Sequence, residues 1–308
     1  MKILVTGADG FVGSRLVPRL AADGHQVTAA IRRGTRAPPG AARVAELELR
    51  DPLSVAACAG AGCDAAVHLA AVATGLEARR DPGAAWEVNA AGTARLCEAL
   101  AAGGGQGMPV CLLVSTAEVY GIGRGEAPRR ETDPVAPVSS YAGSKLGAEI
   151  AGLEVGRRTG LRIVIARPFP HVGAGQNPEL VVSAFARRLR QARALGQDTI
   201  AVGNLNVVRD FLHVDDVVDA YLALVRDGVP GEAYNIASGT PVRLADLLAR
   251  LAALVGVTVR PVTDPALLRT ADVPHLVGDA GKLRARTGWA PRRSLDEALA
   301  EVVGAQAD

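Results

Sequence analysis

The chain contains 308 residues, enough for one large α/β domain or for a large and a small lobe that share a cleft. Hydrophobic residues make up 49% and charged residues 21%, as in ordinary globular proteins, and a net charge of +2 with dispersed basic residues argues against a nucleic-acid-binding surface. No apolar run approaches the ~20 residues that span a bilayer. No charged and apolar leader precedes the first strand, so we expect neither membrane contact nor a signal peptide. The cysteines have no metal-ligand spacing, so we expect no metal and reduced thiols in a cytoplasmic protein; they are Cys58, Cys63, Cys97 and Cys111.

Apolar runs alternate with helical stretches through the first half of the chain. Strands are expected at 2–5, 26–31, 44–49, 65–69, 110–114 and 162–166, and helices at 11–23, 52–60, 84–102 and 139–160. The strands lack polar alternation, which is typical of strands buried on both faces of a parallel sheet. This order predicts an α/β fold with a Rossmann-type doubly wound parallel sheet, which binds ligands beyond the carboxyl ends of its strands.

The pattern changes after residue 168. Residues 169–178 are rich in Pro, Gly, His and Asn and predict a loop. Helices are then expected near 180–194, 215–227, 243–256 and 280–288, with short strands near 199–202, 233–236 and 258–263. We therefore predict an NAD(P)-binding domain over 1–168 and a smaller, mainly substrate-binding lobe over 169–308, allowing for a return of the chain to the large sheet.

A glycine-rich turn directly follows the first strand. Gly7, Gly10 and Gly13 have the spacing Gly-x-x-Gly-x-x-Gly, one residue longer at its start than the usual dinucleotide fingerprint. Such a turn lets the backbone approach a pyrophosphate, which then lies at the N-terminus of the following helix. The alternative is a glycine turn without a ligand, but its position between a strand and an amphipathic helix favours nucleotide binding.

The second strand ends at two arginines, Arg32 and Arg33. An acidic residue at this position would accept the ribose hydroxyls of NAD, whereas guanidinium groups suit the 2′-phosphate of NADP. The sequence therefore favours NADP, with NAD still open. The alternative interpretation is that both arginines are surface charges.

A hydroxyl residue, a tyrosine and a lysine form a proton-relay pattern. Thr116 follows a predicted strand, and Tyr141 and Lys145 lie four residues apart on a predicted helix, so they share a face. A lysine ammonium is expected to lower the pKa of a neighbouring phenol from ~10, which would let tyrosine exchange a proton near neutral pH. Alone, this spacing is typical of a solvated helix face; combined with the glycine turn, it indicates nicotinamide redox chemistry at a hydroxyl or carbonyl group.

Together these motifs resemble the extended short-chain dehydrogenase/reductase family, also described as NAD-dependent epimerases/dehydratases, and the resemblance covers essentially the whole chain. Supporting motifs include His68-Leu69-Ala70-Ala71, residues 88–93 and Arg167-Pro168-Phe169. The resemblance implies that Thr116, Tyr141 and Lys145 are catalytic and that the protein forms a homodimer. It further implies these cofactor contacts: Gly7, Gly10, Phe11, Val12, Gly13, Arg32, Arg33, Glu48, Leu49, Leu69, Ala70, Ala71, Tyr141, Lys145, Pro168 and His171. Glu48 stands where the family usually has aspartate.

The second half most resembles GDP-4-keto-6-deoxy-mannose reductases and, next, GDP-mannose 4,6-dehydratases. The motifs that carry this resemblance are 202–205, 209–216, 234–239, 264–269 and 287–291. It implies that Arg209 and Arg269 clamp the pyrophosphate of a nucleotide sugar, to which each guanidinium group can bond bidentately. The chain departs from the pattern at Pro170, where relatives carry a substrate-contacting asparagine, and at Ala174, where they carry proline.

Three functional hypotheses follow. The first is an NADP(H)-dependent oxidoreductase that reduces the 4-keto group of a GDP-4-keto-6-deoxy-hexose, with Tyr141 as the proton donor. The second is a nucleotide-sugar 4-epimerase or 4,6-dehydratase, for which Glu118 would remove a proton from the carbon next to the oxidised one. The third is a non-catalytic NADP-binding sensor, which has no need of an intact Thr116, Tyr141 and Lys145.

Overall fold

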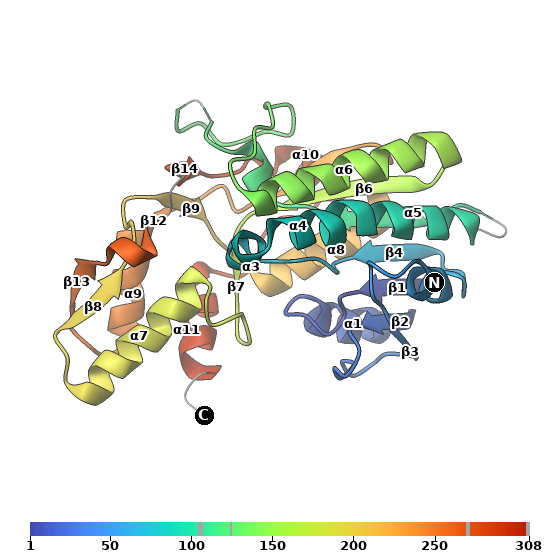
Figure 1. Cartoon of the computed structure of the whole chain (residues 1–308). Coiled ribbons are helices and arrows are strands. Elements are labelled where there is room, and N and C mark those ends of the chain that lie inside the picture. The colour runs from blue at the N-terminus through green and yellow to red at the C-terminus, as the bar shows by residue number, and fades with distance from the viewer. Residues whose placement is uncertain (104–106, 124, 269–271, 306–308) are drawn as a thin grey trace.

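The computed structural model describes residues 1–103, 107–123, 125–268 and 272–305 (Figure 1). A seven-stranded parallel sheet forms the larger lobe, in the order β11-β6-β5-β4-β1-β2-β3. The strands are β1 (Lys2–Thr6), β2 (Gln26–Ile31), β3 (Arg43–Glu46), β4 (Ala65–His68), β5 (Val110–Val114), β6 (Arg162–Pro168) and β11 (Ala233–Ile236). The strand order reverses between β1 and β4, which opens the ligand crevice of a doubly wound sheet beyond the carboxyl ends of these two strands. The predicted fold class is confirmed.

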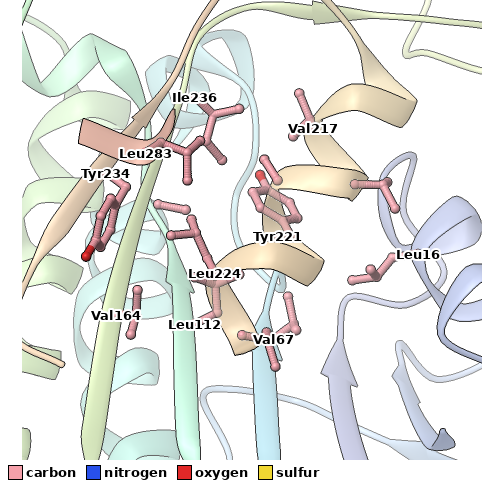
Figure 2. Packing of buried hydrophobic residues seen from close by; sticks show 14 of the residues in the cluster. Leu16, Val67, Leu112, Val164, Val217, Tyr221, Leu224, Tyr234, Ile236 and Leu283 are labelled. Carbon is pink, nitrogen blue, oxygen red and sulfur yellow. The ribbon is translucent and has the colours of Figure 1, made fainter. Parts of the chain in front are cut away.

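In the strands of the large sheet other than the exposed edge strand β3, alternate residues enter two different hydrophobic layers. In β4, Ala65 and Val67 join one core cluster, whereas Ala66 joins the other. Helices α1 (Gly13–Ala22), α8 (Val214–Asp227) and α10 (Gly281–Thr287) cover the first face, and α2 (Pro52–Ala59), α5 (Gly92–Ala102) and α6 (Ser140–Thr159) cover the second. Figure 2 shows Tyr221 and Leu224 of α8 packed over the strands on the first face. Burial on both faces explains why the strands read as continuous apolar runs.

The helix expected at 84–102 is interrupted. The segment consists of α3 (Gly75–Arg80), α4 (Pro82–Trp86), a π-helical turn (Glu87–Ala91) and α5. The Thr93 hydroxyl donates a hydrogen bond to the Asn89 carbonyl at 2.5 Å and so takes the acceptor that an α-helix would offer to the Thr93 N–H. The wider turn aims the Asn89 side chain toward the loop that follows β4, and π turns of this kind often lie at functional sites.

The smaller lobe has its own hydrophobic core, built on α7 (Val181–Leu195), α9 (Leu244–Val255) and α11 (Leu295–Ala305). Short strands border it: β7 (His171–Val172), β8 (Thr199–Val202), β9 (Val208–Asp210), β10 (Leu212–His213), β12 (Pro241–Arg243), β13 (Arg260–Thr263) and β14 (His275–Leu276). Two 3₁₀ turns complete the elements, at Ala117–Tyr120 and Pro265–Leu267. The chain does return to the large sheet, since α8, β11 and α10 pack there, so the smaller lobe is not a continuous stretch of sequence. Helix α11 was not anticipated from the sequence.

Candidate active site

The glycine turn joins β1 to α1 with no room for larger side chains. Gly7 has φ +66°, and a Cβ there would lie 2.8 Å from the Ala70 nitrogen. A Cβ on Gly13 would lie 2.4 Å from the Gly7 carbonyl oxygen. The turn therefore packs directly on the loop after β4, and the N-terminus of α1 opens beside it, as an anion-binding turn requires.

A buried hydrogen-bond relay fixes the loop of Leu69, Ala70 and Ala71. The Thr93 hydroxyl donates to Asn89, so it accepts from His68 Nε2 at 3.0 Å. His68 Nδ1 in turn accepts from the Thr6 hydroxyl at 2.7 Å, and Thr6 Oγ1 accepts from the Ala70 N–H at 3.2 Å. Burial, followed by the charge of Lys145, lowers the pKa of His68 to about 3, so the imidazole stays neutral in this relay.

The basic end of β2 lies next to the glycine turn. Arg32 Nε donates to Asp9 Oδ2 at 2.8 Å, and the Asp9 side chain is only 4% exposed whereas that of Arg32 is 76% exposed. Arg33 is exposed as well. The pair shows that Arg32 is anchored through one edge of its guanidinium group, an arrangement that the sequence did not suggest.

The segment that resembles an adenine contact is split between core and surface. Leu49 is buried against Gly92 of α5. Glu48 is exposed and accepts hydrogen bonds from the backbone and side chain of Arg50, which lower its pKa. Glu48 is thus held in a local turn by Arg50.

The three predicted catalytic side chains meet at the carboxyl end of β5. Thr116 lies just beyond β5 and close enough to the Tyr141 phenol to affect its pKa, and Lys145 lies one turn further along α6. The Ser139 hydroxyl caps this helix by accepting from the Ala142 N–H at 3.1 Å, which fixes where the first turn begins. Thr116 is 8% and Lys145 6% exposed, so these predicted catalytic side chains are largely removed from water.

The pKa values of the tyrosine and the lysine move in opposite directions. Burial raises the pKa of Tyr141 above its usual range, the charge of Glu118 raises it further, and the Thr116 hydrogen bond opposes both. The expectation that Lys145 brings this pKa toward neutrality is therefore not met. Burial lowers the pKa of Lys145 to about 8, against the opposing effect of the Glu149 charge.

Residues that the sequence did not single out support this arrangement. Asn89 accepts from the Val72 N–H at 2.8 Å and donates to the Ser144 hydroxyl at 2.9 Å, which links the loop after β4 to α6. Glu149, one turn beyond Lys145, accepts two hydrogen bonds from Arg167 and one from Ser115. The only sequence signal for Glu149 was its i, i+4 spacing from Lys145, which is equally typical of an exposed pair.

The end of β6 lies beside the glycine turn. Pro168 ends the strand, and the ring of His171 stacks on Phe11 with a centroid distance of 6.1 Å and an interplanar angle of 7°. Val12 packs against the first core cluster. Pro170 contributes its carbonyl, which accepts from the Leu212 N–H at 2.9 Å. The loop that departs from the family pattern is therefore tied by this backbone bond to β10, the strand directly before α8.

On the substrate side, Arg209 is already bonded. It donates to Asp272 Oδ1 at 3.0 Å and to the Val273 carbonyl at 2.7 Å, and its side chain is 13% exposed. Asp272 borders a cavity of about 340 Å³, lined also by Val202, Gly203, Asn204, Leu205, Asn206, Pro261, Thr263 and Leu268. Arg269 lies outside the described residues.

Asp210, next to Arg209, forms hydrogen bonds that hold the backbone at residues 238–239 and at residue 278. It is completely buried and accepts from the N–H groups of Ser238, Gly239 and Gly278 and from the Ser238 hydroxyl.

In the described part of the chain, no group of three or more His, Cys, Asp or Glu residues could hold a metal ion. No described helix is long and apolar enough to cross a membrane.

The family model described as the NAD dependent epimerase/dehydratase family matches residues 3–237. The chain belongs to this family. It is 34% identical to the GDP-6-deoxy-D-mannose reductase of Pseudomonas aeruginosa over 304 residues, which cover 98% of this chain and 96% of that protein. The structure of RMD from Pseudomonas aeruginosa complexed with NADPH is similar with a TM-score of 0.86 and 32% identity, covering 99% of this chain and 98% of the other. The UDP-glucose 4-epimerase of Thermotoga maritima with UDP-glucose has a TM-score of 0.89 at 28% identity, with coverage of 99% and 98%.

Proposed function

We propose that the protein is an NADP(H)-dependent nucleotide-sugar oxidoreductase that reduces the 4-keto group of a GDP-4-keto-6-deoxy-hexose. The observation that carries this proposal is that Thr116, at the end of β5, lies close enough to the Tyr141 phenol to affect its pKa, and that Lys145 follows Tyr141 by one turn of α6. The chain also has a glycine turn suited to a dinucleotide after β1. The reductase relative from Pseudomonas aeruginosa, similar over nearly the whole chain, supports the choice of substrate class.

The residues present fit a dinucleotide. The glycine turn and the N-terminus of α1 would bind the pyrophosphate of the dinucleotide. Arg32 and Arg33 would bind the 2′-phosphate of its adenosine, and residues 69–71 would line the cofactor. When bound, NADPH supplies the hydride for the carbonyl carbon. The NADPH complex of RMD supports NADP, and NAD stays an alternative.

Tyr141 supplies the proton that balances the reaction. Thr116 donates a hydrogen bond to the same carbonyl oxygen, and Tyr141 protonates that oxygen as hydride reaches the carbon. The raised pKa of Tyr141 keeps the phenol protonated at neutral pH, which is the form that a reduction needs. The Lys145 ammonium lies one helical turn from Tyr141. Its positive charge stabilises the Tyr141 phenolate that remains after the proton has been transferred.

Two arginines would hold the diphosphate of the substrate. Arg209 lies near the cavity between β8, β13 and Asp272, whose volume of about 340 Å³ accommodates a nucleoside. Arg269 is the second proposed contact to this diphosphate, as the family resemblance implies. Pro170 supplies no side-chain donor or acceptor, so the identity of the hexose depends on other groups.

A 4-epimerase or 4,6-dehydratase is the second candidate, and Glu118 favours it. Glu118 is close enough to Tyr141 for its charge to raise the Tyr141 pKa, and a carboxylate near this residue has the chemistry of a base. A non-catalytic sensor remains the third candidate, against which the intact triad argues.

Incubation of the purified protein with NADPH and GDP-4-keto-6-deoxy-mannose tests the choice. A reductase consumes one nicotinamide per sugar, seen as loss of nicotinamide absorbance. An epimerase or dehydratase converts its nucleotide sugar with no net change in the cofactor. No turnover of any nucleotide sugar, with tight NADP binding retained, would favour the sensor.

We also propose a homodimer in the cytoplasm. Trp86 and Ile150 are 48% and 62% exposed and border a hollow of about 560 Å³ along α6, lined further by Pro137, Val138, Ser139, Ser140, Gly143, Leu146 and Gly147. Apolar patches of this kind are typical of subunit interfaces. Ile150→Arg is expected to convert a dimer to a monomer in light scattering; an unchanged mass would exclude this face.

A further inference from the structure

Glu149 continues the face of α6 that carries the proposed catalytic pair. Tyr141, Lys145 and Glu149 follow at intervals of four residues, so they lie on one side of the helix in three successive turns. Glu149 is 3% exposed, although glutamate is almost never fully buried unless it is paired. Its burial beside a buried lysine therefore needs an explanation.

Strong hydrogen bonds hold the Glu149 carboxylate in one position. Arg167 Nη2 donates to Oε2 at 2.7 Å and Arg167 Nε to Oε1 at 3.0 Å, a bidentate pair. The Ser115 hydroxyl donates to Oε1 at 2.5 Å, and Ser115 directly precedes Thr116. The carboxylate thus connects α6 to the ends of β5 and β6, the same strand ends that carry the proposed site.

The network extends beyond the carboxylate to the last strand of the sheet. Arg167 Nη1 donates to the Tyr120 hydroxyl at 3.1 Å, and that hydroxyl donates to Asn235 Oδ1 in β11 at 2.7 Å. Asn235 is completely buried and donates to the Arg129 carbonyl at 2.8 Å. Glu149 consequently cannot turn away from α6 without breaking a chain of buried bonds.

We propose that Glu149 is a positioning residue of the reaction, whose fixed negative charge is the counter-charge of the Lys145 ammonium. This inference rests on the proposed roles of Tyr141 and Lys145. Lys145 is buried, and burial disfavours its charged form; the Glu149 charge opposes that effect. Without the carboxylate, the lysine would lose its proton at lower pH and with it the ability to stabilise the Tyr141 phenolate.

Other groups around the pair do not compete for this role. His68, at the end of β4, stays neutral because its pKa lies at about 3, and Tyr221 of α8 has a pKa raised by burial. The charge of Glu118, in the 3₁₀ turn Ala117–Tyr120, raises the pKa of Tyr141. Arg167 pairs directly with Glu149, and the charge of the same carboxylate also acts on Lys145.

The chain has only three lysines, Lys2, Lys145 and Lys282, which permits a direct measurement. Protein labelled with ¹³C at the lysine side chains is titrated by NMR from about pH 6 to about pH 11, a range that brackets an ordinary lysine pKa of ~10.4. Lys145→Met identifies the signal of Lys145, and the other two lysines serve as internal controls. The wild-type midpoint is expected near the value of about 8 given by its burial.

In Glu149→Gln, the midpoint of Lys145 is expected to fall by about one pH unit or more, the usual effect of removing a nearby opposite charge. Since Glu149→Gln leaves Arg167 buried without a counter-charge, Glu149→Gln/Arg167→Gln is measured too and should show the same fall. Ser115→Ala removes a hydrogen bond to the carboxylate but keeps its charge, so its midpoint should stay at the wild-type value. A Lys145 midpoint that is unchanged in both glutamine variants would overturn the proposal.

Turnover separates this proposal from the proposed function. If the protein reduces a GDP-4-keto sugar, the loss of activity at alkaline pH should move to lower pH in Glu149→Gln by the same amount as the lysine midpoint. Turnover limited to another nucleotide sugar refutes the reductase assignment and leaves the lysine titration as the test of Glu149. A uniform loss of activity, with the alkaline limb at its wild-type pH, would mean that Glu149 acts on structure alone.

Discussion

The catalytic end of the site and the diphosphate end differ in how their charged side chains are held. Around Tyr141 and Lys145, the supporting pair Glu149 and Arg167 is 3% and 9% exposed. The pair bonds to Ser115 at the end of β5 and to the Tyr120 hydroxyl, which in turn bonds to Asn235 of β11. At the other end, Arg209 pairs with Asp272 at the border of an open cavity, with exposures of 13% and 19%. One end is fixed before any substrate arrives; at the other, a carboxylate occupies the cation that a substrate diphosphate would need.

This difference matches what each end has to do. Proton transfer requires donors and acceptors at fixed distances, which buried networks provide. Binding of a diphosphate requires a cation that can exchange one anionic partner for another. If Arg209 binds a diphosphate as proposed, that anion would replace Asp272, whose ion pair holds the arginine in position beforehand.

Tyr141→Phe should have the largest effect on activity. Loss of the positioned acid is expected to lower turnover ~10²–10⁴-fold, while affinity for the cofactor stays nearly unchanged because the glycine turn is untouched. The measurement is steady-state turnover together with NADPH binding by fluorescence. Wild-type turnover in this variant would remove Tyr141 from the mechanism and leave the catalytic end without its proton donor.

Arg209→Ala should act on substrate binding alone. Losing one charge-assisted contact to a diphosphate is expected to cost ~1.5–3 kcal/mol, more than a tenfold rise in the Michaelis constant for the nucleotide sugar, with that for the cofactor hardly changed. Arg269→Ala should behave in the same way. The matched variant Asp272→Asn releases Arg209 and should leave substrate affinity equal or tighter. Unchanged substrate affinity in both arginine variants would refute the proposed binding of the diphosphate by these arginines and would weaken the nucleotide-sugar assignment.

Local patterns predicted the fold class, and they placed the glycine turn and the Tyr141–Lys145 spacing on the elements where the structure has them. The strands of the large sheet other than the exposed edge strand β3 could be found because they are buried on both faces, and Gly7, Gly13, Tyr141 and Lys145 because turn and helix spacing are local properties. The π turn was missed because its cause is a hydroxyl–carbonyl bond between Thr93 and Asn89, which helix propensity does not reveal.

The parts that the sequence did not predict depend on contacts between distant residues. Glu149 has the spacing of a surface pair, and only its contact with Arg167 on β6 reveals a buried network. Arg209 was identified by resemblance alone, since nothing in its neighbourhood indicates that its partner is Asp272, 63 residues away. The lowered pKa of Tyr141 was also wrongly expected, because spacing on a helix says nothing about the depth of burial.

Tyr120→Phe tests whether the catalytic end is the more rigidly built. The variant removes a hydroxyl that accepts from Arg167 and donates to Asn235, and it leaves two buried polar groups with one partner fewer. We expect a loss of ~1–3 kcal/mol in the free energy of unfolding, measured by urea denaturation. Asp272→Asn is the control at the other end, where exposure should limit the loss to ~1 kcal/mol or less. Equal losses in the two variants would mean that both ends are held with the same strength.

The basic end of β2 should show the smallest effect, because Arg32 and Arg33 are exposed and solvent screens their charges. Each single change to alanine is expected to weaken NADP binding by ~0.5–1 kcal/mol, about two- to fivefold, and the double change by more. Affinity for NAD should not fall, since NAD has no 2′-phosphate.

Asp9→Asn provides the matched variant: Asp9 holds only the Nε edge of Arg32, which leaves the terminal nitrogens to face a phosphate. If that anchor orients Arg32 usefully, Asp9→Asn weakens NADP by a similar factor; if the carboxylate mainly repels the phosphate, the same variant tightens it. Titrations of both cofactors by intrinsic fluorescence decide between these outcomes. Equal wild-type affinities for NADP and NAD would show that neither arginine selects the cofactor.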